Sequence, residues 1–183
     1  MHSTFPGTTV EVASLGKGSS KSLFDGIFAT GGITLSQVSV MTGLEPYVIQ
    51  NWVKRGFVSS PVKRMYSREQ FARIVIINML RESLQIEKIC GLLHVIGGNP
   101  KDPNDDLIRD DELYHRYVDM ISDPDINVSD DDAVKKTAEI AAEGFGENAA
   151  DTKKLVRILQ VMLYAHAAAA YRERSSQLLS TLQ

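Results

Sequence analysis

Apolar residues recur every three or four positions through most of the chain, which is the spacing of amphipathic α-helices. Leu35, Val38 and Met41 form one short apolar stripe, and a longer stripe begins at Phe71 and runs into a nearly continuous apolar segment. The pattern predicts helices near residues 35–42, 46–55, 67–82, 86–96, 105–121, 130–143 and 155–182. No strand is predicted beyond a two-strand wing, so the expected fold class is all-α.

Start and stop signals divide the first two of these helices sharply. Thr34 followed by Gln37 fits a capping box, in which each side chain bonds the backbone at the other residue, and Ser67 with Gln70 repeats the pattern. Gly43 supplies a left-handed helix stop, and Pro46 suits the first turn of the next helix. Two short helices joined by a tight turn make a helix-turn-helix unit.

The patterns divide the chain into three parts. Residues 1–22 mix Ser, Thr, Gly, Lys and Pro without a sustained period, which predicts a disordered tail. Residues 23–98 form the expected helix-turn-helix head, and residues 99–183 form a helical C-terminal module whose last helix, 152–182, is a candidate dimerisation helix.

Charge separates the same parts. The net charge of −3 is a sum over an acidic middle and two basic flanks: residues 21–98 hold nine bases and five acids, and residues 99–151 hold five bases and sixteen acids. Residues 152–183 hold five bases and one acid. Such asymmetry is typical of a chain with a polyanion-binding half beside a half that repels polyanions, although acids at helix starts also explain part of it.

Candidate chemistry is sparse. The chain has no dinucleotide-binding, phosphate-loop, nucleophile-elbow or zinc-protease motif, and its four histidines are scattered. The single cysteine excludes an intrachain disulfide, no apolar run reaches the roughly 18 residues of a membrane span, and no secretory leader pattern opens the chain. We therefore expect a cytoplasmic protein that is not an enzyme and carries no cofactor, metal site or membrane segment.

The second helix of the unit offers the sharper functional signal. With Val48, Ile49 and Trp52 assigned to the core, its exposed side chains are suited to base edges and phosphates: Tyr47, Gln50, Asn51, Lys54 and Arg55. Lys63 and Arg64 in the following loop would lie over the adjacent DNA backbone. Ser36, Gln37 and Tyr66 complete the predicted DNA-binding set, which lies within residues 36–66. A solvated helix face with two bases is the plainer interpretation of the same pattern.

Two resemblances bear on these residues. The stretch from Ile33 to Pro46, with Trp52 to Val58 and Arg64 to Ser67, resembles the winged helix-turn-helix head of MerR-type transcription regulators. Residues 25–120 look closer still to an uncharacterised bacterial family, the domain of unknown function numbered 1836. The resemblance implies a four-helix head with a short wing. MerR-type heads usually carry arginine and tyrosine where this chain has Gln50 and Asn51, which weakens the electrostatic contribution to DNA affinity.

Three functional hypotheses follow. The leading one is a homodimeric DNA-binding transcription regulator, with double-stranded DNA as partner and the C-terminal helix as the dimer contact, although that helix could equally pack onto its own acidic module. The second is a protein-interaction adaptor that keeps the fold without sequence-specific DNA binding. The third is a small enzyme or effector sensor with a pocket near Tyr114, His115 and Tyr117.

Overall fold

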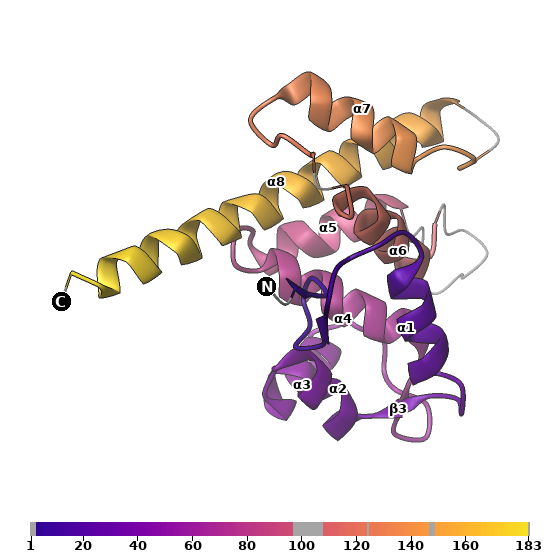
Figure 1. The fold of residues 1–183 in the computed structure, drawn as a ribbon. Coiled ribbons are helices and arrows are strands. Elements are labelled where there is room, and N and C mark those ends of the chain that lie inside the picture. Colours follow the sequence, from indigo (N-terminus) through magenta and orange to yellow (C-terminus); the bar gives the residue numbers. More distant parts are fainter. Residues whose placement is uncertain (1–2, 97–107, 124, 147–148, 183) are drawn as a thin grey trace.

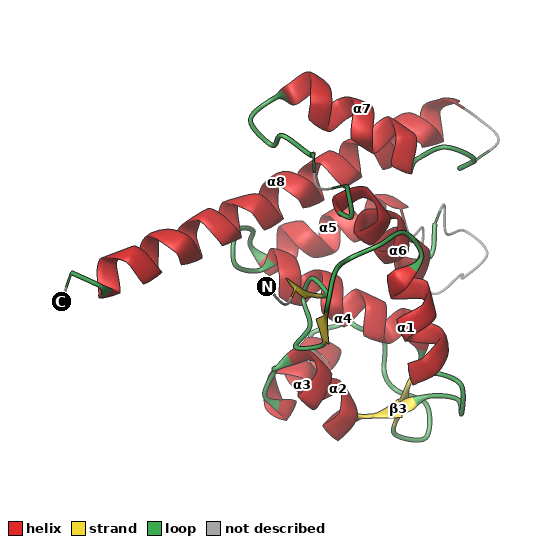
Figure 2. Cartoon of the chain, viewed as in Figure 1, coloured by secondary structure: helices red, strands yellow, loops and turns green. Residues whose placement is uncertain are grey.

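The computed structural model describes residues 3–96, 108–123, 125–146 and 149–182, and this part of the chain is mostly helical (Figures 1 and 2). The helices are α1 (Ser19–Ile27), α2 (Leu35–Thr42), α3 (Pro46–Lys54), α4 (Arg68–Leu80), α5 (Ile86–Ile96), α6 (Asp110–Ile121), α7 (Asp131–Ala141) and α8 (Ala149–Ser180). Two antiparallel pairs of two-residue strands join β1 (Ser3–Thr4) to β2 (Glu11–Val12) and β3 (Ile33–Thr34) to β4 (Met65–Tyr66). The helical class predicted from the sequence is confirmed.

The local signals at the helix ends hold as predicted. Both capping boxes form, from Thr34 with Gln37 and from Ser67 with Gln70. Gly43 ends α2 with a φ of 69°, a left-handed conformation that costs glycine little because it has no Cβ, and Pro46 occupies the first turn of α3. The expected helix starts at Asp105 and Asp106 lie outside the described residues, and α6 begins at Asp110.

One continuous core joins the head to the C-terminal module. Helix α4 is buried on several sides, as its apolar sequence predicted, and α6 packs against it while also contacting α1, α7 and α8. The ion pair of Arg73 Nε with Asp110 Oδ2, 2.7 Å apart, ties α4 to α6. The division predicted at residue 98 therefore does not separate two independent cores.

The prediction of a disordered tail over residues 1–22 is wrong for residues 3–12. Residues 3–12 form the β1–β2 ribbon, whose connecting turn lies between α2, α4 and α6. Asn78 Nδ2 donates to the carbonyls of Gly7 and Thr42, and Tyr114 Oη donates to the carbonyl of Pro6. A Cβ at Gly7 would lie 2.3 Å from the Val75 carbonyl oxygen, so this close approach requires glycine. These contacts join segments far apart in the sequence, so the spacing of apolar residues along the chain could not indicate them.

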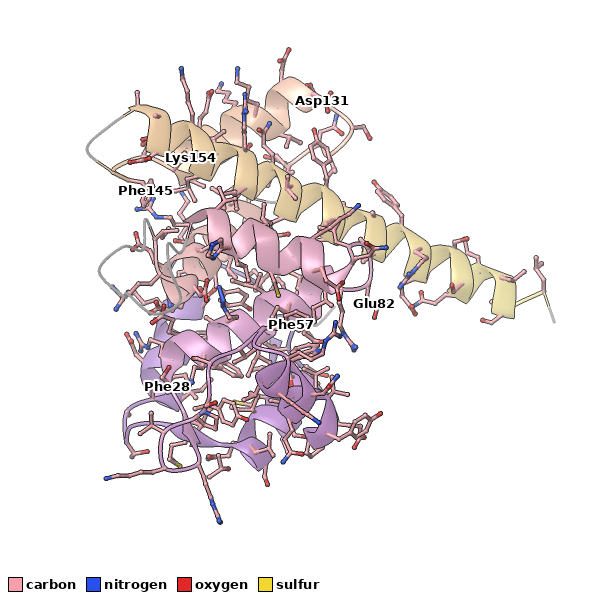
Figure 3. The ribbon with its side chains drawn as sticks, turned by 180° about the vertical axis from the view of Figure 1, so that it is seen from behind. Phe28, Phe57, Glu82, Asp131, Phe145 and Lys154 are labelled. Atoms are coloured by element: carbon pink, nitrogen blue, oxygen red, sulfur yellow. The ribbon has the colours of Figure 1, made fainter. Side chains whose placement is uncertain are left out.

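Helix α8 has two halves with opposite surroundings. Leu155, Leu159 and Met162 in the first half are buried in the shared core, whereas every residue from 170 to 180 is exposed. Figure 1 shows this second half projecting away from the rest of the chain, and Figure 3 shows Glu82 near the point where it leaves. The side chain of Glu82 pairs with Arg172 there. No helix among the described residues is long and apolar enough to cross a membrane.

Candidate nucleic-acid interface

Helix α3 presents one polar stripe to solvent. Ile49 and Trp52 bury one side of the helix, which leaves a row at helical spacing on the other: Tyr47, Gln50, Asn51 and Lys54. All four are exposed, and the Tyr47 side chain has a relative exposure of 69%. The structure thus brings these four of the sequence-predicted residues together on one face.

Arg55 does not belong to that stripe, because its side chain binds other residues of the molecule. Its Nη2 lies 2.7 Å from Glu87 Oε1 on α5, and its guanidinium stacks 4.4 Å from the ring centroid of Phe57, the residue labelled in Figure 3. The same contact with Arg55 helps to lower the pKa of Glu87 below its usual value, after a backbone hydrogen bond within Glu87 itself. Arg55 therefore has an intramolecular anion as its partner, which the sequence pattern did not reveal.

Lys63 and Arg64 occupy the tip of a tight hairpin. The backbone groups of Val62 and Met65 bond each other in both directions, so Lys63 and Arg64 are the two central residues of the turn. Their φ angles are 49° and 66°, the positive values of a type I′ turn, which Asn and Gly normally occupy. Holding two long basic residues in this conformation is strained, and such strain gathers at functional sites.

Of the remaining predicted residues, Tyr66 is buried and Gln37 has a structural partner, whereas Ser36 is exposed. Tyr66 is only 3% exposed and pairs with Ile33 in the β3–β4 ribbon, and burial raises the pKa of its hydroxyl. Gln37 Oε1 accepts the backbone N–H of Thr34 at 2.8 Å in the capping box. Ser36 is exposed in the first turn of α2. Tyr66 therefore belongs to the core and Gln37 to the helix cap, and neither is included in the candidate surface.

The candidate surface consists of the α3 stripe, Ser36 and the hairpin tip. Helix α2 packs against both α3 and the β3–β4 ribbon, so these parts lie at one end of the molecule (Figure 1). Lys54, Lys63 and Arg64 form no ion pair within the described residues. The acidic helix α7 lies at the opposite end (Figure 1). The arrangement provides unpaired cations and amide side chains on one surface, separated from most of the acids.

Three features of this end were not predicted from the sequence: two exposed apolar side chains and one strained turn. Val40 and Val62 are 75% and 73% exposed. The spacing of apolar residues did not indicate them because they lie outside the buried stripes. The positive φ angles at Lys63 and Arg64 were also unexpected.

Residues 33–117 match the family described as a domain of unknown function (DUF1836). This match covers α2 to most of α6, and it confirms for that segment the resemblance to an uncharacterised family. No curated protein and no solved structure matches the chain.

Proposed function

We propose that this chain is a cytoplasmic DNA-binding transcription regulator, without enzymatic activity, whose residues 33–96 act as a MerR-like winged helix-turn-helix head. In this proposal α2 and α3 form the helix-turn-helix, with α3 entering the major groove, and the Val62–Met65 hairpin is a shortened wing over the phosphates. The observation that carries the proposal is the strained turn that holds Lys63 and Arg64 on the same end as the α3 stripe. Neither residue forms an ion pair within the part of the chain that the structure describes.

The residues divide into two roles. Gln50 and Asn51 are central in the exposed α3 stripe, and amide side chains can bond adenine edges with two hydrogen bonds. Lys54, Lys63 and Arg64 would contact phosphates, which contribute affinity and salt dependence but little sequence preference. Arg55 could join them only by exchanging Glu87 for a phosphate.

Salt-dependent binding tests the phosphate role. Fluorescence anisotropy with a labelled random-sequence duplex would be recorded for the wild type, for the pair Lys63→Ala with Arg64→Ala, and for Lys54→Ala, starting near 50 mM salt. We expect each lost phosphate contact to reduce the slope of log K against log salt by about 1. Lys88→Ala with Lys153→Ala, two exposed lysines elsewhere on the chain, is the matched control. Equal slopes in all four proteins would contradict the proposal.

The projecting half of α8 supports a homodimer. Four residues of α8 lie alternately three and four positions apart, the repeat of a coiled-coil seam: Ala168, Tyr171, Ser175 and Leu178. Leu182 continues this spacing in the turn after the helix. Leu178 and Leu182 are exposed, as is Tyr171. A second copy would bury this stripe and place two heads on one duplex, with half-sites about 34 Å apart.

Sedimentation velocity tests that contact. Tyr171→Glu with Leu178→Glu should convert a dimer into a monomer, because charges would face each other across an apolar seam. The change lies outside the core, so the monomer should still unfold cooperatively, with a lower melting temperature because the stabilisation by association is lost. A wild-type protein that is monomeric throughout the micromolar range would contradict the dimer.

A protein-interaction adaptor is the second candidate, favoured by the exposed apolar side chains at the same end. Val40, Tyr47 and Val62 are each more than two-thirds exposed. An adaptor should bind DNA weakly without sequence preference, and Val40→Ser with Val62→Ser should abolish binding of its protein partner. Selection of duplexes from a random library decides between the two: enrichment of a defined site favours the regulator, and no enrichment favours the adaptor.

A further inference from the structure

A cleft of about 630 Å³ lies on α6, and none of its lining residues comes from α2, α3 or the Val62–Met65 hairpin. One wall is the loop before α1 and the first turn of α1, and the other is the last turns of α7. Helix α6 forms the floor. The first helical turns of α4 contribute Arg68 at the edge. Four separate segments therefore converge on one cavity, which places residues from positions 17 to 141 side by side.

Two buried polar atoms in this cleft have no hydrogen bond within the described part of the chain. They are Oδ1 of Asp111 and Nε2 of His115, one helical turn apart on α6. Asp111 is only 3% exposed, and its other oxygen, Oδ2, accepts a long bond of 3.4 Å from Arg109 Nη2. Within the described residues, its ion pair with Arg109 brings Nε no nearer than 3.4 Å to Oδ1. A ligand that supplies an N–H to this buried carboxylate at a shorter distance would therefore gain free energy.

His115 is prepared to act as an acceptor in the same place. Its Nδ1 lies 2.9 Å from the hydroxyl of the fully buried Ser20, and burial lowers the pKa of the ring, so it is neutral near pH 7. When Nδ1–H donates to Ser20 Oγ, Nε2 carries a free lone pair. The floor of the cleft then presents two acceptors, a carboxylate oxygen and an imidazole nitrogen, which together suit an ammonium group.

Basic side chains also line the cleft. Lys17 and Lys21 form no ion pair within the described residues, and Arg109 contacts only Asp111, at 3.4 Å or more. The other two cations of the cleft are already engaged. Arg68 pairs with Asp25, and Arg116 binds Glu112 together with the carbonyls of Ala141 and Glu143. Lys17 and Lys21 are thus available to an anion at the mouth, whereas Arg109 would have to leave Asp111 to join them.

We propose that this cleft binds a small zwitterion of the amino-acid class, with its ammonium on Asp111 and His115 and its carboxylate on Lys17 and Lys21. Half-exposed Ile140 of α7 and the adjacent Ala141 supply apolar surface for a side chain. A metal ion suits the cleft less, because the described residues contain no group of three or more His, Cys, Asp or Glu side chains placed to hold one. The proposal stands independently of DNA binding.

Thermal shift tests the ligand class directly. The full chain, without DNA, would be melted in the presence of each common L-amino acid in turn, and calorimetric titration would give the Kd of any that raises Tm. For each one that binds, the amino-acid amide and the acid lacking the amine are matched probes that remove one charge each. We expect both analogues to bind at least about tenfold more weakly, the loss expected for one charge-assisted hydrogen bond.

Variants locate the site. Lys17→Ala with Lys21→Ala should weaken binding about tenfold or more through the carboxylate, and Asp111→Asn should weaken it through the ammonium. The lysine pair is exposed, so it keeps the test valid if Asp111→Asn unfolds the chain. Lys88→Ala with Lys153→Ala is the control and should bind as the wild type does. If no amino acid raises Tm, or if the Lys17 and Lys21 pair binds with unchanged Kd, the proposal is wrong.

Discussion

Helices α3 and α6 are both amphipathic and both begin without a side-chain cap, yet they use charge in opposite ways. Helix α3 packs chiefly on α2 and buries only Ile49 and Trp52, so its polar residues remain in solvent. Helix α6 is surrounded by α1, α4, α7 and α8 and buries seven residues, including Asp110 and Asp111. Charge on a peripheral helix is available to a partner, whereas charge on a central helix becomes part of the fold.

The largest expected loss of stability comes from removing the ion pair between Arg73 of α4 and Asp110 of α6. Arg73→Ala leaves Asp110, whose side chain is only 11% exposed, without its guanidinium, and should lower the free energy of unfolding by about 2 to 3 kcal/mol. Lys54→Ala on α3 removes an unpaired exposed cation and should cost less than about 0.5 kcal/mol. Urea denaturation measures both. Equal losses would mean that the two helices do not differ in this way.

The next effect concerns the hydroxyl by which α6 holds the N-terminal ribbon. Tyr114→Phe removes the 2.8 Å bond to the Pro6 carbonyl in a fully buried position and should lower stability by about 1.5 kcal/mol. In this variant the amides of residues 3–12 should exchange faster than in the wild type, whereas those of α3 should exchange at the wild-type rate. If only α3 exchanges faster, the ribbon is held by other contacts.

At the α3 end, one change should raise stability. Lys63→Asn with Arg64→Gly supplies the residues that a type I′ turn prefers, and relief of the positive φ angles should stabilise the fold by about 1 kcal/mol. The same change removes two cations, so DNA affinity should fall while Tm rises. A variant that loses both stability and affinity would indicate that Lys63 and Arg64 have structural roles instead.

The smallest effect is a pH dependence confined to the α6 end. Burial lowers the pKa of both His115 and His166 in the folded chain below the ordinary value of 6.5, and His166 Nδ1 lies 2.7 Å from the Tyr117 hydroxyl. The unfolded chain therefore binds protons more readily, and the stability associated with neutral histidine is present above pH 6.5 and declines as the pH falls below it.

Urea denaturation between pH 8 and pH 5 measures this decline. His115→Gln with His166→Gln should make the decline shallower, because glutamine can still bond at these positions but does not titrate in this range. The comparison with wild type at pH 8, where both proteins have neutral side chains, corrects for any change in packing. An unchanged decline in the double variant would assign the pH dependence to other groups.

Local signals explain what could be predicted. The capping boxes at Thr34 and Ser67, the stop at Gly43 and the start at Pro46 depend on residues within four positions of each other, and the structure bears out each of them. The α3 stripe followed from the same periodicity. The pairing of Arg55 with Glu87, the burial of Tyr66 and the ordered ribbon of residues 3–12 depend on distant segments, and the sequence pattern indicated none of them.

By itself the sequence determined seven of the helices and the ends marked by the capping boxes, Gly43 and Pro46, because side-chain periodicity and capping act over a few residues. Tertiary structure decided which charges stay free. An ion pair with Glu87 of α5 occupies Arg55, while no acid pairs with Lys54, Lys63 or Arg64 within the described residues. Tertiary packing also assembled the α6 cleft from segments as distant as Lys17 and Ile140. Solvation and ion pairing depend on neighbours in space, which only the folded chain supplies.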